Sequence, residues 1–106
     1  MPHYLVTASY TSDGVKGLTK DKASGRKAAV TRAVEALGGK LQAMYFAFGE
    51  DDVLLIAELP DNVTAAALSL AVAATGLVSA RTTVLLTVEE VDQAIGKSVD
   101  YKPPGH

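Results

Sequence analysis

Three consecutive carboxylates, Glu50-Asp51-Asp52, are the densest group of potentially reactive side chains in the sequence. Clustered carboxylates can bind a hard cation or share a proton. Adjacent residues of an extended chain point to opposite sides, however, so three acids in a row rarely converge on one point. Gly49 precedes them, and a Gly at a hairpin tip permits a positive φ. We therefore predict that residues 49–52 connect two strands, with Asp52 anchoring neighbouring backbone N–H groups or lining the mouth of a cleft.

Three further side chains are candidates for binding a ligand. His3 is the only histidine inside a predicted element, and one histidine without any cysteine cannot make a zinc site. Tyr45 can line an apolar pocket, and Arg81 can bind an acidic ligand or pair with Asp52 or Glu58. We predict His3, Tyr45, Asp52 and Arg81 as ligand-binding residues, without a catalytic set, a metal site or a cofactor. Core or interface packing of Tyr45 and an ion pair of Arg81 are the structural alternatives.

Composition limits the classes of partner. The chain has 106 residues, which suits one domain, and its ten basic and twelve acidic residues give a net charge of -2. No basic field is present to hold nucleic acid or an anionic membrane. The chain contains no cysteine, which fits a reducing compartment, and its longest apolar run is too short to span a bilayer. No signal peptide is visible at the N-terminus, so we expect a cytoplasmic protein.

The elements that must position these side chains follow from apolar periodicity and from turn residues. Residues 11–14 carry turn chemistry, and residues 15–24 are either an irregular first helical turn or a loop. Gly38-Gly39 and Gly76 are suited to end helices, Asp61 or Asn62 can begin one, and Thr87 to Glu90 have the spacing of a capping box. Strands are predicted at 3–10, 40–48, 53–59 and 79–86, and helices before Gly38, at 63–75 and after Thr87.

This order predicts an α+β domain of the ferredoxin-like type, β-α-β-β-α-β, with a four-stranded antiparallel sheet and helices on one face. We predict that residues 1–96 form the domain and that residues 97–106 are a flexible tail. In the third strand both alternate sets are apolar, Val53 with Leu55 on one side and Leu54 with Ile56 on the other. A strand that is apolar on both sides needs cover on both. We therefore predict a homodimer, or a higher homo-oligomer, in which two sheets pair face to face.

Segments along most of the chain resemble the GYD domain family, one of the dimeric α/β-barrel, ferredoxin-like proteins. The resemblance is carried by YTSDGVKGL after the first strand, by GGKLQAMYFAFGEDD over the hairpin and by LPDNVTAAALSLAVAATGLVSARTTVLLTVEE in the second half. It covers residues 3 to 95. The Gly-Tyr-Asp signature falls on Gly49 and Asp52, with Asp51 where the family has an aromatic residue. The resemblance implies the fold and self-association, but no common reaction.

Two functional hypotheses remain. The first is a small oligomeric module that binds a small apolar or aromatic molecule between helices and sheet. The second is a cofactor-independent monooxygenase-like or isomerase-like enzyme that places His3, Tyr45 or Arg81 against a substrate in the barrel cavity. An amino-terminal proline can act as a general base through its free secondary amine. Pro2 could have this role only if Met1 were removed. A binding protein should have an enclosed pocket of some hundreds of cubic ångströms with converging polar groups, whereas a purely structural module should have a filled sheet.

Overall fold

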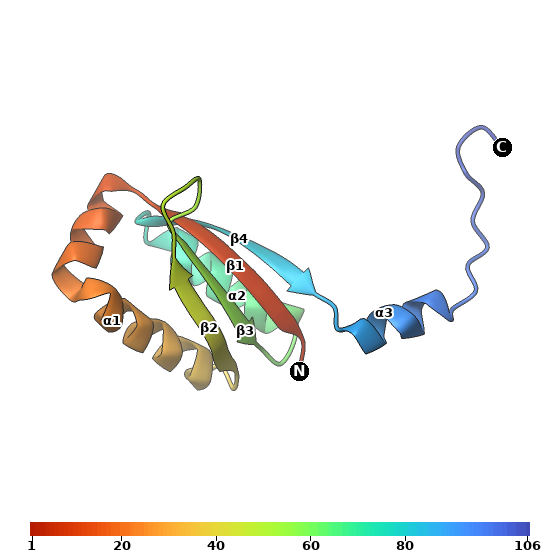
Figure 1. Cartoon of the computed structure of the whole chain (residues 1–106), viewed down its shortest axis with the longest axis horizontal. Helices are drawn as coiled ribbons and strands as arrows, with labels where there is room; N and C mark the ends of the chain where they lie inside the picture. The colour runs from red at the N-terminus through yellow and green to blue at the C-terminus, as the bar shows by residue number, and fades with distance from the viewer.

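The chain forms one four-stranded antiparallel sheet with two helices on one face and a third helix beyond the sheet (Figure 1). The computed structural model describes residues 1–106, and the order of strands in the sheet is β2-β3-β1-β4. This is the predicted ferredoxin-like architecture. The elements are β1 (His3–Tyr10), α1 (Ser12–Ala36), β2 (Lys40–Phe46), β3 (Val53–Glu58), α2 (Asn62–Ala74), β4 (Val78–Leu85) and α3 (Val88–Ile95).

The strands lie close to their predicted positions, and β1 has the predicted bounds. The second strand is shorter than predicted, because it ends at Phe46 rather than at Phe48. The backbone N–H of Ala47 donates to the carbonyl oxygen of Asp52 at 2.8 Å, which closes the loop between β2 and β3. Phe48 lies beyond this closure and is fully exposed. The strand therefore ends where the ladder of hydrogen bonds to β3 gives way to the hydrogen bond that closes the loop.

Helix α1 begins where a turn was predicted. Thr11 is its N-cap, and the Thr11 hydroxyl accepts a hydrogen bond from the Gly14 N–H. Residues 11–14 are thus the start of a helix, so the prediction of a separate turn is wrong. Gly14 is buried there, and a Cβ at this position would overlap the carbonyl oxygen of Leu77. Helix α1 is also kinked at Lys22, which has φ 64° and ψ 165°.

The predicted helix ends are confirmed. Gly38 and Gly76 have positive φ after α1 and α2. Asp61 caps α2, and hydrogen bonds from the Thr64 hydroxyl and backbone N–H lower the pKa of the Asp61 carboxyl. Glu90 belongs to the predicted capping box of α3. Its pKa is lowered by hydrogen bonds from the backbone N–H and the side chain of the N-cap residue.

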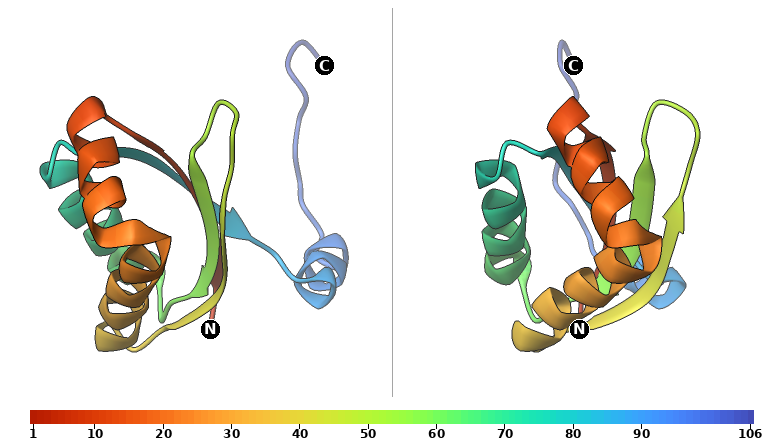
Figure 2. Two further views of the ribbon diagram at one scale, coloured as in Figure 1. Left: turned by 60° about the vertical axis from the view of Figure 1, so that its left-hand side comes forward. Right: turned by 90° about the vertical axis from the view of Figure 1, so that its left-hand side faces the viewer.

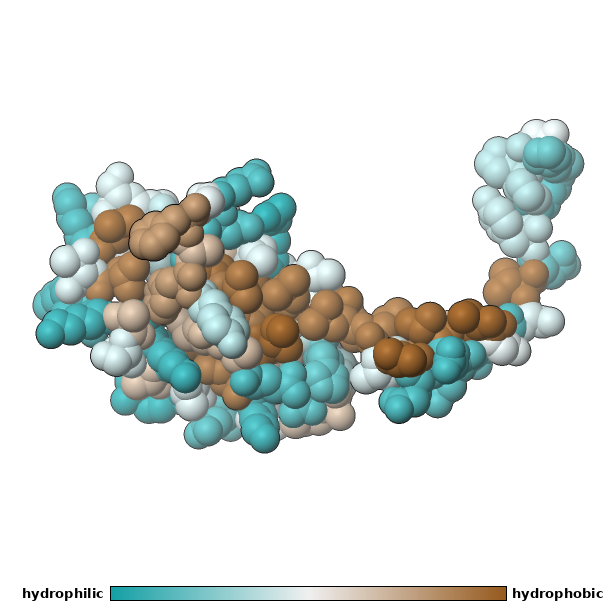
Figure 3. Space-filling model, viewed as in Figure 1, coloured by the Kyte–Doolittle hydropathy of each residue, from teal (hydrophilic) through white to brown (hydrophobic).

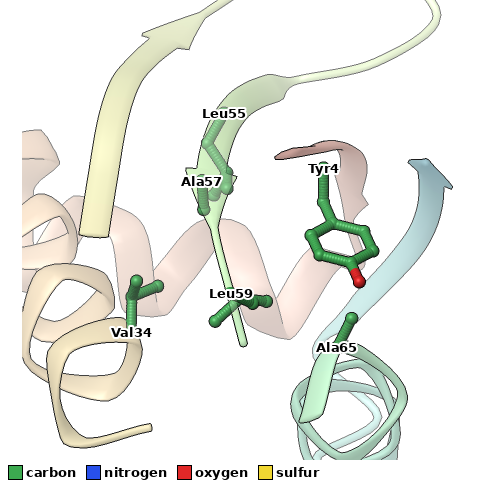
Figure 4. Packing of buried hydrophobic residues seen from close by; sticks show 6 residues of the cluster. All are labelled: Tyr4, Val34, Leu55, Ala57, Leu59 and Ala65. Carbon is green, nitrogen blue, oxygen red and sulfur yellow. The ribbon is translucent and has the colours of Figure 1, made fainter. Parts of the chain in front are cut away.

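The hydrophobic core lies between the sheet and helices α1 and α2, which cover the same face (Figure 2). Tyr4 is 1 % exposed, and its hydroxyl donates to Asn62 Oδ1 at 2.6 Å, at the start of α2. Figure 4 shows the Tyr4 ring directed toward α2, with Val34 of α1 at the other end of the cluster and Leu59 between them. Small and medium side chains fill the remainder: Leu55, Ala57 and Ala65. The core is therefore small for a chain of this length.

The other face of the sheet carries no helix and has an apolar centre. Leu5 and Ile56 are register partners on β1 and β3, and Leu54 lies beside them on the same face. Their side chains are partly exposed in the single chain. Figure 3 shows apolar residues gathered across this face and continuing along the connection to α3. We call this surface the helix-free face.

Helix α3 and the residues after it extend away from the sheet (Figures 1 and 2). Its apolar residues Val88, Val91 and Ile95 occupy positions i, i+3 and i+7, so they share one side of the helix. They are 80 %, 41 % and 76 % exposed. Residues 97–106 contain no helix or strand. None of the three helices is both long enough and apolar enough to cross a membrane.

Candidate functional site

A mainly apolar cleft lies between α1, α2 and the sheet. It has a volume of about 170 Å³, and its walls are mainly apolar. The sheet forms its floor with the inward side chains of β1, β3 and β4, and residues of α1 and α2 form its sides. Many of these positions are alanines, so the helices are held above the sheet without filling the space between them. Representative lining residues are Ala8, Ala29, Val30, Leu55, Leu68 and Ala80.

Four polar side chains face the cleft. The hydroxyls of Ser69 on α2 and Thr82 on β4 lie 2.9 Å apart, and the Ser69 hydroxyl also donates to the Ala65 carbonyl. This pair ties α2 to β4 across one side of the cleft. Tyr10 and Arg26 lie elsewhere along its wall. The cleft therefore combines an apolar interior with a few polar groups, which is the usual composition of a small-molecule site.

Arg26 lies between this cleft and a second, more polar cavity of about 210 Å³. Both cavities are lined by Tyr10 and Arg26, and Asp21 lines only the second. Arg26 Nη1 lies 3.5 Å from Asp21 Oδ2, and the two side chains are partly exposed. The kink at Lys22 separates this pair along α1. Asp21 and Arg26, which lie on the two sides of the kink, both border the second cavity.

The four residues predicted to bind a ligand do not line the cleft. His3, Tyr45 and Arg81 project from the helix-free face, the opposite side of the sheet. Tyr45 and Arg81 lie at the two ends of one row across the sheet, and His3 lies further along β1. Asp52 is the last residue of the loop between β2 and β3. The structure therefore does not bring these four side chains together.

His3 contacts Glu58 at the end of β1. His3 Nε2 lies 3.3 Å from Glu58 Oε1, and both side chains are about a quarter exposed. His3 Nδ1 is buried and has no hydrogen-bond partner. The pair borders the apolar centre of the helix-free face, so the Glu58 carboxylate contributes negative charge to the rim of that surface.

The three acids at residues 50–52 act separately, in agreement with the predicted connector. Asp52 Oδ2 accepts a hydrogen bond from the Tyr10 N–H at 2.8 Å, so Asp52 anchors the backbone as predicted. Both carboxylate oxygens of Asp51 lie within 3.2 Å of Arg81 Nη2. Arg81 thus forms the predicted kind of ion pair, but with Asp51 rather than Asp52 or Glu58. The expectation for Gly49 is wrong, because Gly49 does not have a positive φ.

The cleft residues Arg26, Ser69 and Thr82 were not among the candidates from the sequence. A single arginine in a helix and two separate hydroxyl residues form no recognisable motif. The one available signal was the predominance of alanine and valine among the apolar residues, because small side chains between a sheet and its helices leave space. That signal indicates a loosely filled interface without indicating which polar groups border it.

The strand order and the cleft define an α+β domain of the ferredoxin-like type with a cavity between its two layers. The family model of the GYD domain matches residues 4–95. Because this match spans most of the 106 residues, the chain belongs to the GYD domain family. No curated protein and no solved structure matches the chain significantly.

Proposed function

We propose that this protein is a self-associating module that binds a small apolar or aromatic molecule in the cleft between α1, α2 and the sheet. The observation that carries the proposal is the mainly apolar cavity of about 170 Å³. An apolar cavity of about 150 Å³ stays dry and accommodates benzene, so a cavity of this size suits a ligand with one ring. Binding would bury an apolar ring against the surrounding side chains and add van der Waals contacts to them.

The helix-free face supports self-association. Its centre is formed by Leu5, Leu54 and Ile56, and charged pairs border it. An apolar centre with a polar rim is the usual anatomy of a protein interface. The charged rim contains Arg81 with Asp51 as well as Glu58 beside His3, so it presents both signs of charge to an identical surface. A second copy of the chain is therefore the partner that we propose for this face.

The exposed helix α3 is a second reason to propose another copy of the chain as the partner. An isolated helix of eight residues is not stable in water, because forming its first turn costs more than its few hydrogen bonds return. The apolar surface of the helix-free face continues along the connection to this helix (Figure 3), and the helix itself exposes Val88, Val91 and Ile95. We propose that this helix packs against the second copy, so that one association covers both the sheet and the helix.

The enzyme hypothesis stays a prediction. It places His3, Tyr45 or Arg81 against a substrate, and these side chains lie on the helix-free face rather than in the cleft. Catalysis by them would therefore need a cavity between two paired sheets.

A thermal-shift measurement with one-ring aromatic compounds tests the binding function. Ligands that bind only the folded protein raise its melting temperature in proportion to their concentration and affinity. Ala80→Leu places three more carbons on the cleft floor, and it should abolish the ligand-induced shift while leaving the protein folded. Ala67→Leu makes the same change at an exposed position of α2 that does not line the cleft, and it should preserve the shift. A panel without any shift for the unmodified protein would refute the binding function.

A further inference from the structure

We infer that the cleft selects amphipathic monocarboxylic acids, with the apolar body inside the cleft and the carboxylate on Arg26. This inference rests on the proposed function and specifies its ligand class. It depends on the position of one guanidinium, which borders the apolar cleft on one side and the more polar cavity on the other.

The two cavities differ in the chemistry of their walls. The first has a floor of valine, leucine and alanine side chains from the sheet, whereas the second is lined by Gly14, Gly17, Asp21 and Thr75 among others. They share Tyr10, Val72, Val78 and Arg26. A ligand that extends from the first cavity toward the second would therefore pass from apolar surroundings to a polar region at Arg26.

Arg26 retains hydrogen-bonding capacity for an anion. Its single polar partner is Asp21, at 3.5 Å from Nη1, and this distance is too long for a strong hydrogen bond. A guanidinium has five N–H donors arranged to bind a carboxylate through two of them. The Arg26 side chain is 34 % exposed, so its charge is partly removed from solvent and still reachable. A ligand carboxylate can thus bind Arg26 without removing the Asp21 contact.

The charge of α1 favours an anionic ligand over a cationic one. The basic residues of the helix are Lys16, Lys20, Lys22, Arg26, Lys27 and Arg32, and its acidic residues are Asp13, Asp21 and Glu35. The chain as a whole is slightly acidic, so this excess of positive charge is local to the helix that borders the cleft. Such a local excess raises the concentration of anions at the cleft mouth.

A titration with two matched probes tests the inference. We would measure binding of 3-phenylpropanoate and of 3-phenyl-1-propanol by calorimetry, at neutral pH, where the acid is ionised. The acid should bind the unmodified protein about tenfold more tightly than the alcohol, and added salt should weaken only the acid. Arg26→Gln should abolish this preference, so that the acid binds the variant no more tightly than the alcohol does. Lys27→Gln, at the exposed neighbouring position, should retain the preference.

The outcomes separate this inference from the function on which it rests. If the alcohol binds and the acid binds no better, the carboxylate preference is refuted and the apolar cleft function stands. The role of Arg26 is also refuted if the acid is preferred but Arg26→Gln has no greater effect than Lys27→Gln, because the anion would then bind elsewhere. If neither probe binds, both proposals are refuted. Circular dichroism melts of both variants would verify that each one is folded.

Discussion

Replacement of Ile56 by threonine should weaken self-association without unfolding the subunit. Ile56 lies on β3 at the centre of the helix-free face, in register with Leu5. Threonine keeps the β-branched shape that suits a strand but replaces apolar surface with a hydroxyl. Full burial of an isoleucine side chain contributes about 1.5–3 kcal/mol, and Ile56 is already partly buried in the single chain. We therefore expect a loss of about 1.5 kcal/mol per subunit.

The proposed dimer would contain this substitution twice, so its Kd should rise by about two powers of ten, or about 3 kcal/mol. Sedimentation velocity over a range of micromolar concentrations measures this change directly. Val63→Thr is the control, because Val63 is 79 % exposed at the start of α2, away from the helix-free face. A Kd that Ile56→Thr and Val63→Thr affect equally would refute this interface. A single 11.0 kDa species of the unmodified protein at every concentration would refute self-association altogether.

Gly14→Ala should lower the free energy of unfolding by about 2 kcal/mol or more in denaturant titrations, because a Cβ at this position overlaps the Leu77 carbonyl. Gly49→Ala is the control, because a Cβ at residue 49 meets open space and should change the free energy of unfolding little. Equal effects of these two changes would contradict the close approach of α1 to the chain before β4. Lys22→Gly should raise the free energy of unfolding by about 1 kcal/mol, because it relieves a side chain held at φ 64°; a loss of stability would argue against the kink. Stability should also fall in acid, because folding lowers the pKa values of the two helix-capping carboxyls from their ordinary 3.8 and 4.5. The two carboxyls contribute their full stabilisation above the unfolded-state pKa values and lose it as pH falls through the lower pKa values of the folded state. A melting temperature that rises on acidification from pH 5 to pH 3 would therefore contradict the caps.

Local signals in the sequence predicted most of the fold. The alternation in β3 divided its residues correctly between the two sides of the sheet, but it did not indicate which side faces the helices, because both sets are apolar. Asp61 and Gly76 bounded α2 through capping interactions that involve only a few neighbouring residues. The errors also arose locally. Thr11 can begin either a turn or a helix, and the contact of Gly14 with a distant segment of the chain decides in favour of the helix.

The cleft could not be predicted because it depends on how two helices stand over one sheet. Ala29 and Ala80 line the cleft. Alanine occurs both in tightly packed interfaces between a sheet and its helices and in interfaces that leave a cavity, so its presence does not predict the cleft. The kink that brings Asp21 and Arg26 to the cavity border occurs at Lys22, in a conformation that glycine ordinarily adopts. The lysine at this position does not indicate a kink. The charged groups that border the cleft can therefore be identified only from the three-dimensional structure.

Nuclear Overhauser effects between a bound aromatic alcohol and the methyl groups of the protein test the cleft function most directly. With 3-phenyl-1-propanol and methyl-labelled protein, we predict contacts from the ring protons to the methyl groups of Ala80 and Leu68, which lie inside the cleft. Contacts restricted to Leu5 and Ile56 would place the ligand on the helix-free face and would contradict the function proposed for the cleft.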